Sequence, residues 1–187
     1  MSQFKDLYRG RRVLVTGHTG FKGSWLSMWL SALGAKVVGV ALVPQTEPSH
    51  FKIAKMEGIL DDHCLDIRDG EVLKSLVLRT QPDFVFHLAA QSLVRQSYLD
   101  PVGTYQTNVL GTLNLLESLR LLETPCTAVL VTSDKCYNNV EWIWGYRETD
   151  ALGGPDPYSA SKGAAELVIR SHVKSFFPKD GPVSIAI

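Results

Sequence analysis

Three glycines between residues 17 and 23 constrain the fold more than any other feature of this sequence. They occur in the segment Gly17-His-Thr-Gly20-Phe-Lys-Gly23, directly after an apolar run and at the start of an amphipathic stretch. We expect Gly17 to allow a tight turn, Gly20 to let the backbone approach a pyrophosphate, and Gly23 to let a helix pack closely on a strand. The unpaired N–H groups at the start of that helix would face the phosphates. The pattern therefore predicts a dinucleotide-binding turn; a glycine-rich turn without a ligand is the alternative.

Short runs of β-branched residues alternate with helical patterns over the rest of the chain, which is typical of a parallel sheet with helices on both sides. The expected strands are residues 12–16, 36–42, 83–88, 127–132 and 183–187, with residues 63–65 as a weaker candidate. The expected helices are residues 21–33, 69–80, 102–122 and 158–177. We therefore predict an α/β fold, a Rossmann-type doubly wound parallel sheet, in which residues 1–187 form one dinucleotide-binding domain that also carries the catalytic residues.

Composition limits the binding partners and the cellular compartment that we expect for this chain. The chain has 19 Lys and Arg residues and 19 Asp and Glu residues, so no net charge draws it to nucleic acid or to an anionic membrane. Cys64, Cys126 and Cys136 follow no metal or disulfide spacing, which indicates a reducing compartment and no metal site. The polar N-terminus is unlike a signal peptide, and no stretch approaches the ~20 apolar residues that a membrane span needs. A cytoplasmic protein is expected.

Tyr158 and Lys162 lie four residues apart in the last expected helix, and therefore on one face of it. A tyrosine that acts as a base near neutrality must lose roughly 3 units from its ordinary pKa of ~10, which is about 4 kcal/mol. A cation ~4 Å away at an effective dielectric constant of ~20 supplies about that much. The pair therefore predicts hydride-transfer chemistry, with Tyr158 as the base and Lys162 as the cation; an exposed helical pair without a catalytic role is the alternative.

Further polar residues are placed to take part in this chemistry. Ser133 lies at the end of the expected strand over residues 127–132, where a parallel sheet presents side chains to a ligand, and its hydroxyl could bond the substrate oxygen. Asp134 and Lys135 follow directly, and an acid and an amine at this place suggest proton transfer in addition to oxidation. Asn108 interrupts the long expected helix, where it would distort the local hydrogen bonding and bind water or substrate; a purely structural role is an equal alternative.

Three segments carry a resemblance to a known family: Thr132-Ser-Asp-Lys-Cys-Tyr137, Glu141-Trp-Ile-Trp-Gly-Tyr-Arg-Glu148 and Leu152-Gly-Gly-Pro-Asp-Pro-Tyr158-Ser-Ala-Ser-Lys162. Together with the G-x-x-G-x-x-G spacing of the glycine turn, they resemble the extended short-chain dehydrogenase/reductases that act on nucleotide sugars, and within these the 4,6-dehydratases. The resemblance covers essentially the whole chain. It implies NAD as cofactor, CDP-glucose as the nucleotide-sugar substrate, and a homodimer or higher homo-oligomer formed through the two longest helices.

The resemblance also assigns places to the cofactor. Asp66-Ile67 matches the segment that holds the adenine, and the small residues after His87 would lie against the ribose and the nicotinamide. The cofactor residues expected on this basis are Gly17, Thr19, Gly20, Phe21, Lys22, Gly23, Asp66, Ile67, Leu88, Ala89, Ala90, Tyr158 and Lys162, and the substrate residues are Gln91, Asn108 and Ser133. The second strand lacks the usual acid for the adenosine ribose, since none occurs before Glu47, so the choice between NAD and NADP is weakly marked.

The implied reaction has three steps. Tyr158 takes the proton of the 4-hydroxyl group while hydride passes from C4 of the hexose to NAD. A base then removes the C5 proton while an acid protonates the departing C6 hydroxyl, and the stored hydride returns to C6. Asp134 matches the family's acid. Lys135 stands where the dTDP-glucose dehydratases carry glutamate; it is expected to act as the base in a pair that titrates as a unit with Asp134, or to stay charged and stabilise the enolate.

Several alternatives share parts of this pattern. Another nucleotide-sugar dehydratase, a 4-epimerase or a decarboxylating relative would keep the glycine turn, Tyr158 and Lys162, but a 4-epimerase needs no acid for elimination at C6. A cofactor-binding module without turnover would need only the glycine turn. The sequence stops at residue 187 in the middle of an expected strand. This predicts a truncated chain that lacks most of a C-terminal substrate-binding portion; a final edge strand is the alternative.

Overall fold

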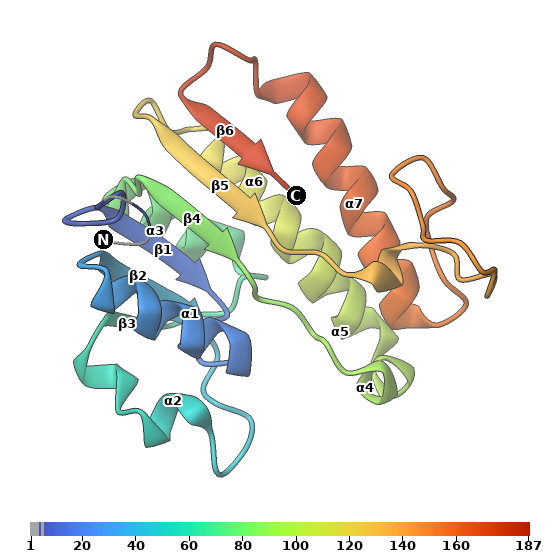
Figure 1. The fold of residues 1–187 in the computed structure, drawn as a ribbon, viewed down its shortest axis with the longest axis horizontal. Helices are drawn as coiled ribbons and strands as arrows, with labels where there is room; N and C mark the ends of the chain where they lie inside the picture. Colours follow the sequence, from blue (N-terminus) through green and yellow to red (C-terminus); the bar gives the residue numbers. More distant parts are fainter. Residues whose placement is uncertain (1–3, 5) are drawn as a thin grey trace.

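The computed structural model describes residue 4 and residues 6–187, and strands alternate with helices along them as predicted (Figure 1). The strands are β1 (Arg12–Thr16), β2 (Lys36–Ala41), β3 (Asp61–Cys64), β4 (Phe84–His87), β5 (Cys126–Leu130) and β6 (Val183–Ala186). The α-helices are α1 (Phe21–Ala32), α2 (His50–Ile53), α3 (Gly70–Thr80), α4 (Val94–Leu99), α5 (Pro101–Tyr105), α6 (Gly111–Leu119) and α7 (Pro157–Phe176). Two 3-10 segments, η1 (Met56–Gly58) and η3 (Asp134–Cys136), and the π-helical segment η2 (Gln106–Leu110) complete the description. None of the helices within these described residues is both long and apolar enough to cross a membrane.

The six strands form one parallel sheet in the order β3-β2-β1-β4-β5-β6. Val13 of β1 pairs with Val37 of β2 on one side and with Phe84 of β4 on the other. The chain moves outward from β1 to β3, crosses back to β4 and continues outward to β6, which confirms the predicted doubly wound, Rossmann-type sheet. In such a sheet, ligands bind at the carboxyl edge beside the point where the strand order reverses, which here lies between β1 and β4.

Helices cover both faces of the sheet, α1 on one and α3, α6 and α7 on the other (Figure 1). The larger core cluster includes Leu14 of β1, Leu115 of α6 and Ile169 of α7. The smaller cluster includes Val13 of β1 and Leu30 of α1. Val13 and Leu14 are neighbours in sequence and belong to different clusters because successive strand side chains point to opposite faces. The strand is therefore buried on both sides, as its unbroken apolar run predicts.

The helix predicted over residues 102–122 shows the largest local difference. It begins at Pro101 and ends at Leu119, and its middle turns form η2 instead of a regular α-helix. The Asp100 side chain caps it by accepting a hydrogen bond from Gly103 N at 2.8 Å. The wider π turn carries Asn108, which is 1% exposed. The predicted distortion of hydrogen bonding around Asn108 is confirmed.

Further differences concern short elements. The weak strand predicted over residues 63–65 lies over Asp61–Cys64, where it pairs with β2 at the edge of the sheet. The helices α2 and α4 were not predicted, because four and six residues contain too few turns to show a helical period. Local capping defines α2 instead, since the Ser49 hydroxyl accepts a hydrogen bond from Lys52 N at 3.3 Å.

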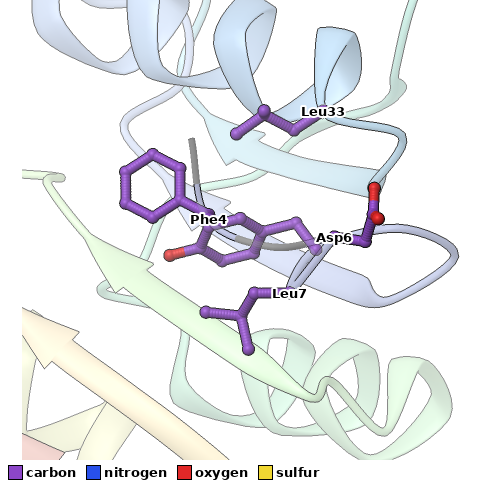
Figure 2. A pocket seen from close by; sticks show the side chains of 5 residues that line it. Phe4, Asp6, Leu7 and Leu33 are labelled. Carbon is purple, nitrogen blue, oxygen red and sulfur yellow. The ribbon is translucent and has the colours of Figure 1, made fainter. Parts of the chain in front are cut away.

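A small pocket lies near the N-terminus (Figure 2). Phe4, Asp6, Leu7 and Tyr8, which precede β1, line it together with Leu33, which follows α1. Because a crossover helix runs back along its parallel strands, the end of α1 lies at the amino edge of the sheet. This pocket is therefore separate from the predicted cofactor site at the carboxyl edge.

The buried core of α6 provides a test of the fold. Replacement of Leu115, which is fully buried, by alanine should lower the free energy of unfolding by about 2–5 kcal/mol, because it removes apolar contacts and leaves a cavity. Leu121→Ala is the matched control, since Leu121 is 49% exposed and its truncation should cost much less. Urea denaturation measures both. Equal losses for the two variants would contradict the assignment of α6 to the core.

Candidate active site

The glycine turn joins β1 to α1 at the carboxyl edge of the sheet. Gly17 has a φ of +77°, which L side chains rarely adopt, and its N–H donates to the carbonyl of Val40 at 2.7 Å. A Cβ atom on Gly17 would lie 2.7 Å from the backbone N of Ala89, so the turn packs directly on the segment after β4. Gly20, the N-cap of α1, offers no capping side chain, which leaves the first N–H groups of the helix open to a ligand. This geometry fits a pyrophosphate.

The other predicted cofactor residues of this turn are Thr19, Phe21, Lys22 and Gly23. Thr19 donates its hydroxyl to the carbonyl of Leu42 at 2.8 Å and so ties the turn to the end of β2. Phe21 is 73% exposed, and Lys22 beside it is exposed as well. Gly23 is buried, and a side chain there would overlap the carbonyl of Gly17, as expected for close packing of the helix on the strand.

The predicted adenine segment follows β3. The Asp66 carboxylate accepts hydrogen bonds from Arg68 at 2.8 Å and 2.6 Å, and these hydrogen bonds are the main cause that lowers the pKa of Asp66. Ile67 is 4% exposed and packs at Gly111, where an added Cβ would lie 2.5 Å from its Cδ1 atom. Asp66 is therefore partly exposed at the carboxyl edge of the sheet, and Ile67 belongs to the hydrophobic core.

His87, the last residue of β4, lies at the centre of a buried hydrogen-bonded chain. The Thr112 hydroxyl donates to the carbonyl of Asn108, so its oxygen accepts from His87 Nε2 at 3.0 Å. His87 Nδ1 then accepts from the Thr16 hydroxyl at 2.7 Å, and Thr16 Oγ1 accepts from Ala89 N at 3.2 Å. Burial, and repulsion from Lys162 as the second cause, lower the pKa of His87 to about 3. A neutral imidazole therefore fixes the backbone after β4, where the half-buried Leu88, Ala89 and Ala90 lie.

Helix α7 carries the predicted hydride-transfer pair. Asp156 caps it by accepting hydrogen bonds from the Ser159 N–H at 3.0 Å and the Ser159 hydroxyl at 2.6 Å. Tyr158 is 9% exposed and Lys162 is 6% exposed, so the pair is not a solvated helical pair. Burial lowers the pKa of Lys162, and the nearby carboxylate of Glu166 opposes that shift.

The predicted acid and amine follow β5 in η3. The Ser133 hydroxyl donates to Asp134 Oδ1 at 3.0 Å and accepts from the backbone N of Lys135 at 3.2 Å. Ser133 is half-buried, whereas Asp134 and Lys135 are exposed. The three polar residues thus form one short hydrogen-bonded turn at the carboxyl edge, open to a ligand.

In the structure, the turn formed by Ser133, Asp134 and Lys135 packs against α7. Thr132, the residue before Ser133, donates its hydroxyl to Glu166 Oε1 at 2.6 Å. The approach is close at Gly163, where a Cβ atom would lie 3.1 Å from the carbonyl oxygen of Cys136. Residues 133–135 and the face of α7 with Tyr158 and Lys162 therefore lie on neighbouring elements, which no spacing in the sequence could establish.

Asn108 and Gln91 connect α7 to the segment after β4. The Asn108 side chain accepts from Gln91 N at 2.8 Å and donates to Gln91 O at 3.0 Å and to Ser161 Oγ at 2.9 Å. The Gln91 side chain donates to Thr104 Oγ1 at 3.0 Å and accepts from Leu93 N at 2.7 Å. These bonds hold the loop after β4 against α7, so Asn108 has a structural role, and its proposed contact with substrate remains a prediction.

The loop between η3 and α7 contains an aromatic stack. The rings of Tyr137 and Tyr146 stack with centroids 5.5 Å apart, and Trp142 lies 5.5 Å from Tyr146 on a tilted plane. Trp142 is 44% exposed and Trp144 is 66% exposed. The W-x-W-G-Y segment thus lies in the loop after η3, where Trp142 and Tyr146 are in ring contact.

Three buried polar side chains were not predicted from the sequence to belong to the site. His18 is fully buried, its Nε2 atom lies 2.8 Å from Asp62 Oδ1, and a Cβ atom on Gly39 would lie 2.5 Å from its ring. His87 and Glu166 are the others. Only Glu166 had a usable signal, because it follows Lys162 by four residues and must share its helix face. Asp62, the partner of His18, lies on β3, and sequence spacing carries no information about this contact.

Comparison with known proteins assigns the chain to a protein family. The family model described as GDP-mannose 4,6 dehydratase matches residues 14–177. The chain belongs to this family. The predicted resemblance to nucleotide-sugar dehydratases of the short-chain dehydrogenase/reductase type is therefore confirmed.

Individual relatives narrow the comparison. The chain is 53% identical to a CDP-glucose 4,6-dehydratase of Salmonella typhimurium over 173 residues, which cover 92% of this chain and 48% of the relative. It is 33% identical to a dTDP-glucose 4,6-dehydratase of Xanthomonas campestris pv. campestris over 168 residues, which cover 84% of this chain and 48% of the relative. The solved UDP-glucose 4-epimerase of Thermus thermophilus in complex with NAD matches with a TM-score of 0.73 and 31% identity, over 88% of this chain and 51% of that one. The chain thus spans about half the length of these relatives.

The buried His87 makes the stability of this site depend on pH. The folded state keeps His87 neutral down to about pH 3, whereas the unfolded chain takes up a proton below its ordinary pKa of 6.5. The free energy of unfolding should therefore fall by about 1.4 kcal/mol per pH unit as the pH drops below 6.5. His87→Gln should lack this part of the slope, as measured by urea denaturation at several pH values. His172→Gln is the comparison variant, since His172 lies on α7 with its Nε2 atom 3.0 Å from Glu117 Oε1. An unchanged slope in His87→Gln would show that His87 is not buried in its neutral form.

Proposed function

We propose that the protein is a NAD-dependent nucleotide-sugar 4,6-dehydratase, a lyase that converts CDP-glucose to CDP-4-keto-6-deoxyglucose. The packing of η3, with Ser133, Asp134 and Lys135, against the helix of Tyr158 and Lys162 carries this proposal. A hydride-transfer pair alone would serve an oxidoreductase, whereas an acid and an amine beside it supply the proton transfers that loss of water requires. The 53% identity to the Salmonella CDP-glucose 4,6-dehydratase supports CDP-glucose as the substrate.

NAD is the proposed cofactor, and the Thermus neighbour described as a complex with NAD supports it. The glycine turn and the open N-terminus of α1 would hold its pyrophosphate, and the backbone at Leu88–Ala90 would lie beside its nicotinamide half. When bound, NAD supplies the acceptor for hydride from C4 of the hexose and the donor of hydride to C6.

The residues of the chain would handle the protons. Tyr158 would take the proton of the 4-hydroxyl group, with the ammonium of Lys162 one helical turn away to stabilise the phenolate and the Ser133 hydroxyl to bond the same oxygen. The 4-ketone so formed makes the C5 proton acidic. Lys135 would remove it or stabilise the enolate, while Asp134 would protonate the departing C6 hydroxyl. The hydrogen bond from Ser133 to Asp134 couples the two halves of this scheme.

The decisive assay incubates the full-length protein and NAD with CDP-glucose, dTDP-glucose and UDP-glucose in parallel, and follows the base-induced absorbance of 4-keto sugars. We expect a 4-keto-6-deoxy product, with turnover highest on CDP-glucose. NMR of the products tests for the 4-epimer, which the similarity to UDP-glucose 4-epimerase makes the main alternative. A 4-epimer without loss of water would contradict the proposal.

Lys135 can be tested separately from the oxidation. Lys135→Met should lower turnover and the exchange of the C5 proton with D2O at least ~100-fold, the usual size of a general acid–base contribution. Oxidation at C4, followed as NADH absorbance in a single turnover, should persist because Tyr158 and Lys162 are unchanged. Lys174→Met, an exposed lysine in the last turn of α7, is the control. Wild-type exchange at C5 in Lys135→Met would remove both proposed roles of Lys135.

A further inference from the structure

Glu166 is a buried carboxylate that the proposed reaction does not use. It is 5% exposed and follows Lys162 by four residues and Tyr158 by eight, so all three lie along one face of α7. A carboxylate taken out of water costs several kcal/mol unless it is paired and hydrogen-bonded. Its burial therefore calls for a specific set of partners.

Both oxygens of Glu166 are in contact with polar groups. Oε1 accepts the hydroxyl of Thr132 at 2.6 Å, a short bond of the kind that a charged acceptor makes. Oε2 lies 3.5 Å from Arg170 Nε. Arg170 is 39% exposed in this pair, so solvent screens its attraction for the carboxylate. The pair with Arg170 is thus too weak to account for the burial of the carboxylate.

The bond to Thr132 joins the two elements of the candidate active site. Thr132 immediately precedes Ser133 and η3, and Glu166 lies one turn beyond Lys162 on α7. A change in this bond would move Ser133 relative to Tyr158, although neither Thr132 nor Glu166 needs to touch a substrate. Displacements of ~1 Å in such an arrangement can lower a rate about 100-fold.

The charge of Glu166 acts on Lys162. Lys162 is 6% exposed, and burial is the main cause that lowers its pKa. Glu166 is the largest opposing influence, followed by the Cys136 thiol of η3. On β4, the neutral His87 faces the same lysine. Burial raises the pKa of the Cys136 thiol, which keeps it protonated, so Glu166 supplies the negative charge near Lys162.

We propose that Glu166 is a positioning residue that ties η3 to α7 through Thr132 and keeps the buried Lys162 in its ammonium form. The proposal rests on the proposed function only for the identity of the reaction. It assigns to a residue outside the Tyr158–Lys162 pair the control of that pair's charge and placement.

Two variants of the whole protein separate the two roles. Glu166→Gln keeps the volume and an oxygen that accepts from Thr132, but it removes the charge. Thr132→Val removes the hydroxyl donor and keeps the charge. Glu71→Gln is the matched control, because the Glu71 side chain is 84% exposed on α3.

The first measurement is the affinity for NADH between about pH 6 and pH 10, from quenching of tryptophan fluorescence, which needs no turnover. Wild-type binding should weaken at high pH as Lys162, a proposed contact of the cofactor, loses its proton. Loss of the Glu166 charge lowers the pKa of Lys162, so this weakening should begin at a lower pH in Glu166→Gln than in the wild type. Thr132→Val should keep the wild-type pH profile and lower turnover on CDP-glucose about 10-fold.

Each of the two proposed roles of Glu166 has its own contradicting result. A midpoint in Glu166→Gln equal to that of Glu71→Gln, or a wild-type profile without weakening at high pH, overturns the charge role. Wild-type turnover in Thr132→Val overturns the link between η3 and α7. If Glu166→Gln does not fold, the wild-type profile at high pH still tests the charge role, and Thr132→Val still tests the link between η3 and α7. Failure of the dehydratase assay would leave the NADH measurement intact, so the two proposals fail separately.

Discussion

The contact between the glycine turn and the end of β4 is the constraint on which the site depends. A side chain at Gly17 would collide with the backbone of Ala89, so β1 and β4 can end side by side only because this position has no Cβ. The strand order reverses between the same two strands, which leaves an opening at the carboxyl edge. The N-terminus of α1 and the backbone after β4 lie at that opening, and Asn108 joins the segment after β4 to Ser161 near the start of α7.

Hydrogen bonds between buried polar groups fix the positions of the segments that form the site. The chain from Asn108 through Thr112 and His87 to Thr16 fixes the segment after β4, and the Asn108 amide extends the same network to Ser161 on α7. Such networks restrict a site to one arrangement because each unpaired buried group would cost about 1–3 kcal/mol. The Thr132–Glu166 bond adds the same restriction between β5 and α7.

The course of the strands and of the longer helices was predictable, because apolar runs and helical periods are local properties of the sequence. The glycine turn, the Tyr158–Lys162 pair and the distortion at Asn108 were predictable for the same reason. The short helices α2 and α4 were not, since too few turns leave no period. The partners of His18 and the hydrogen bond that Thr132 donates to Glu166 were also beyond the sequence, because they join residues on different elements.

The sequence by itself determined which groups the protein offers: a glycine turn between β1 and α1, a tyrosine and lysine on one helix face, and an acid and amine after β5. Fixed covalent spacing and helical geometry suffice for those conclusions. Only the tertiary structure decided that η3 lies on α7, that Lys162 is buried beside Glu166, and that His87 is neutral. Those properties depend on burial and on contacts between distant segments, and both arise only when the sheet and its helices pack together.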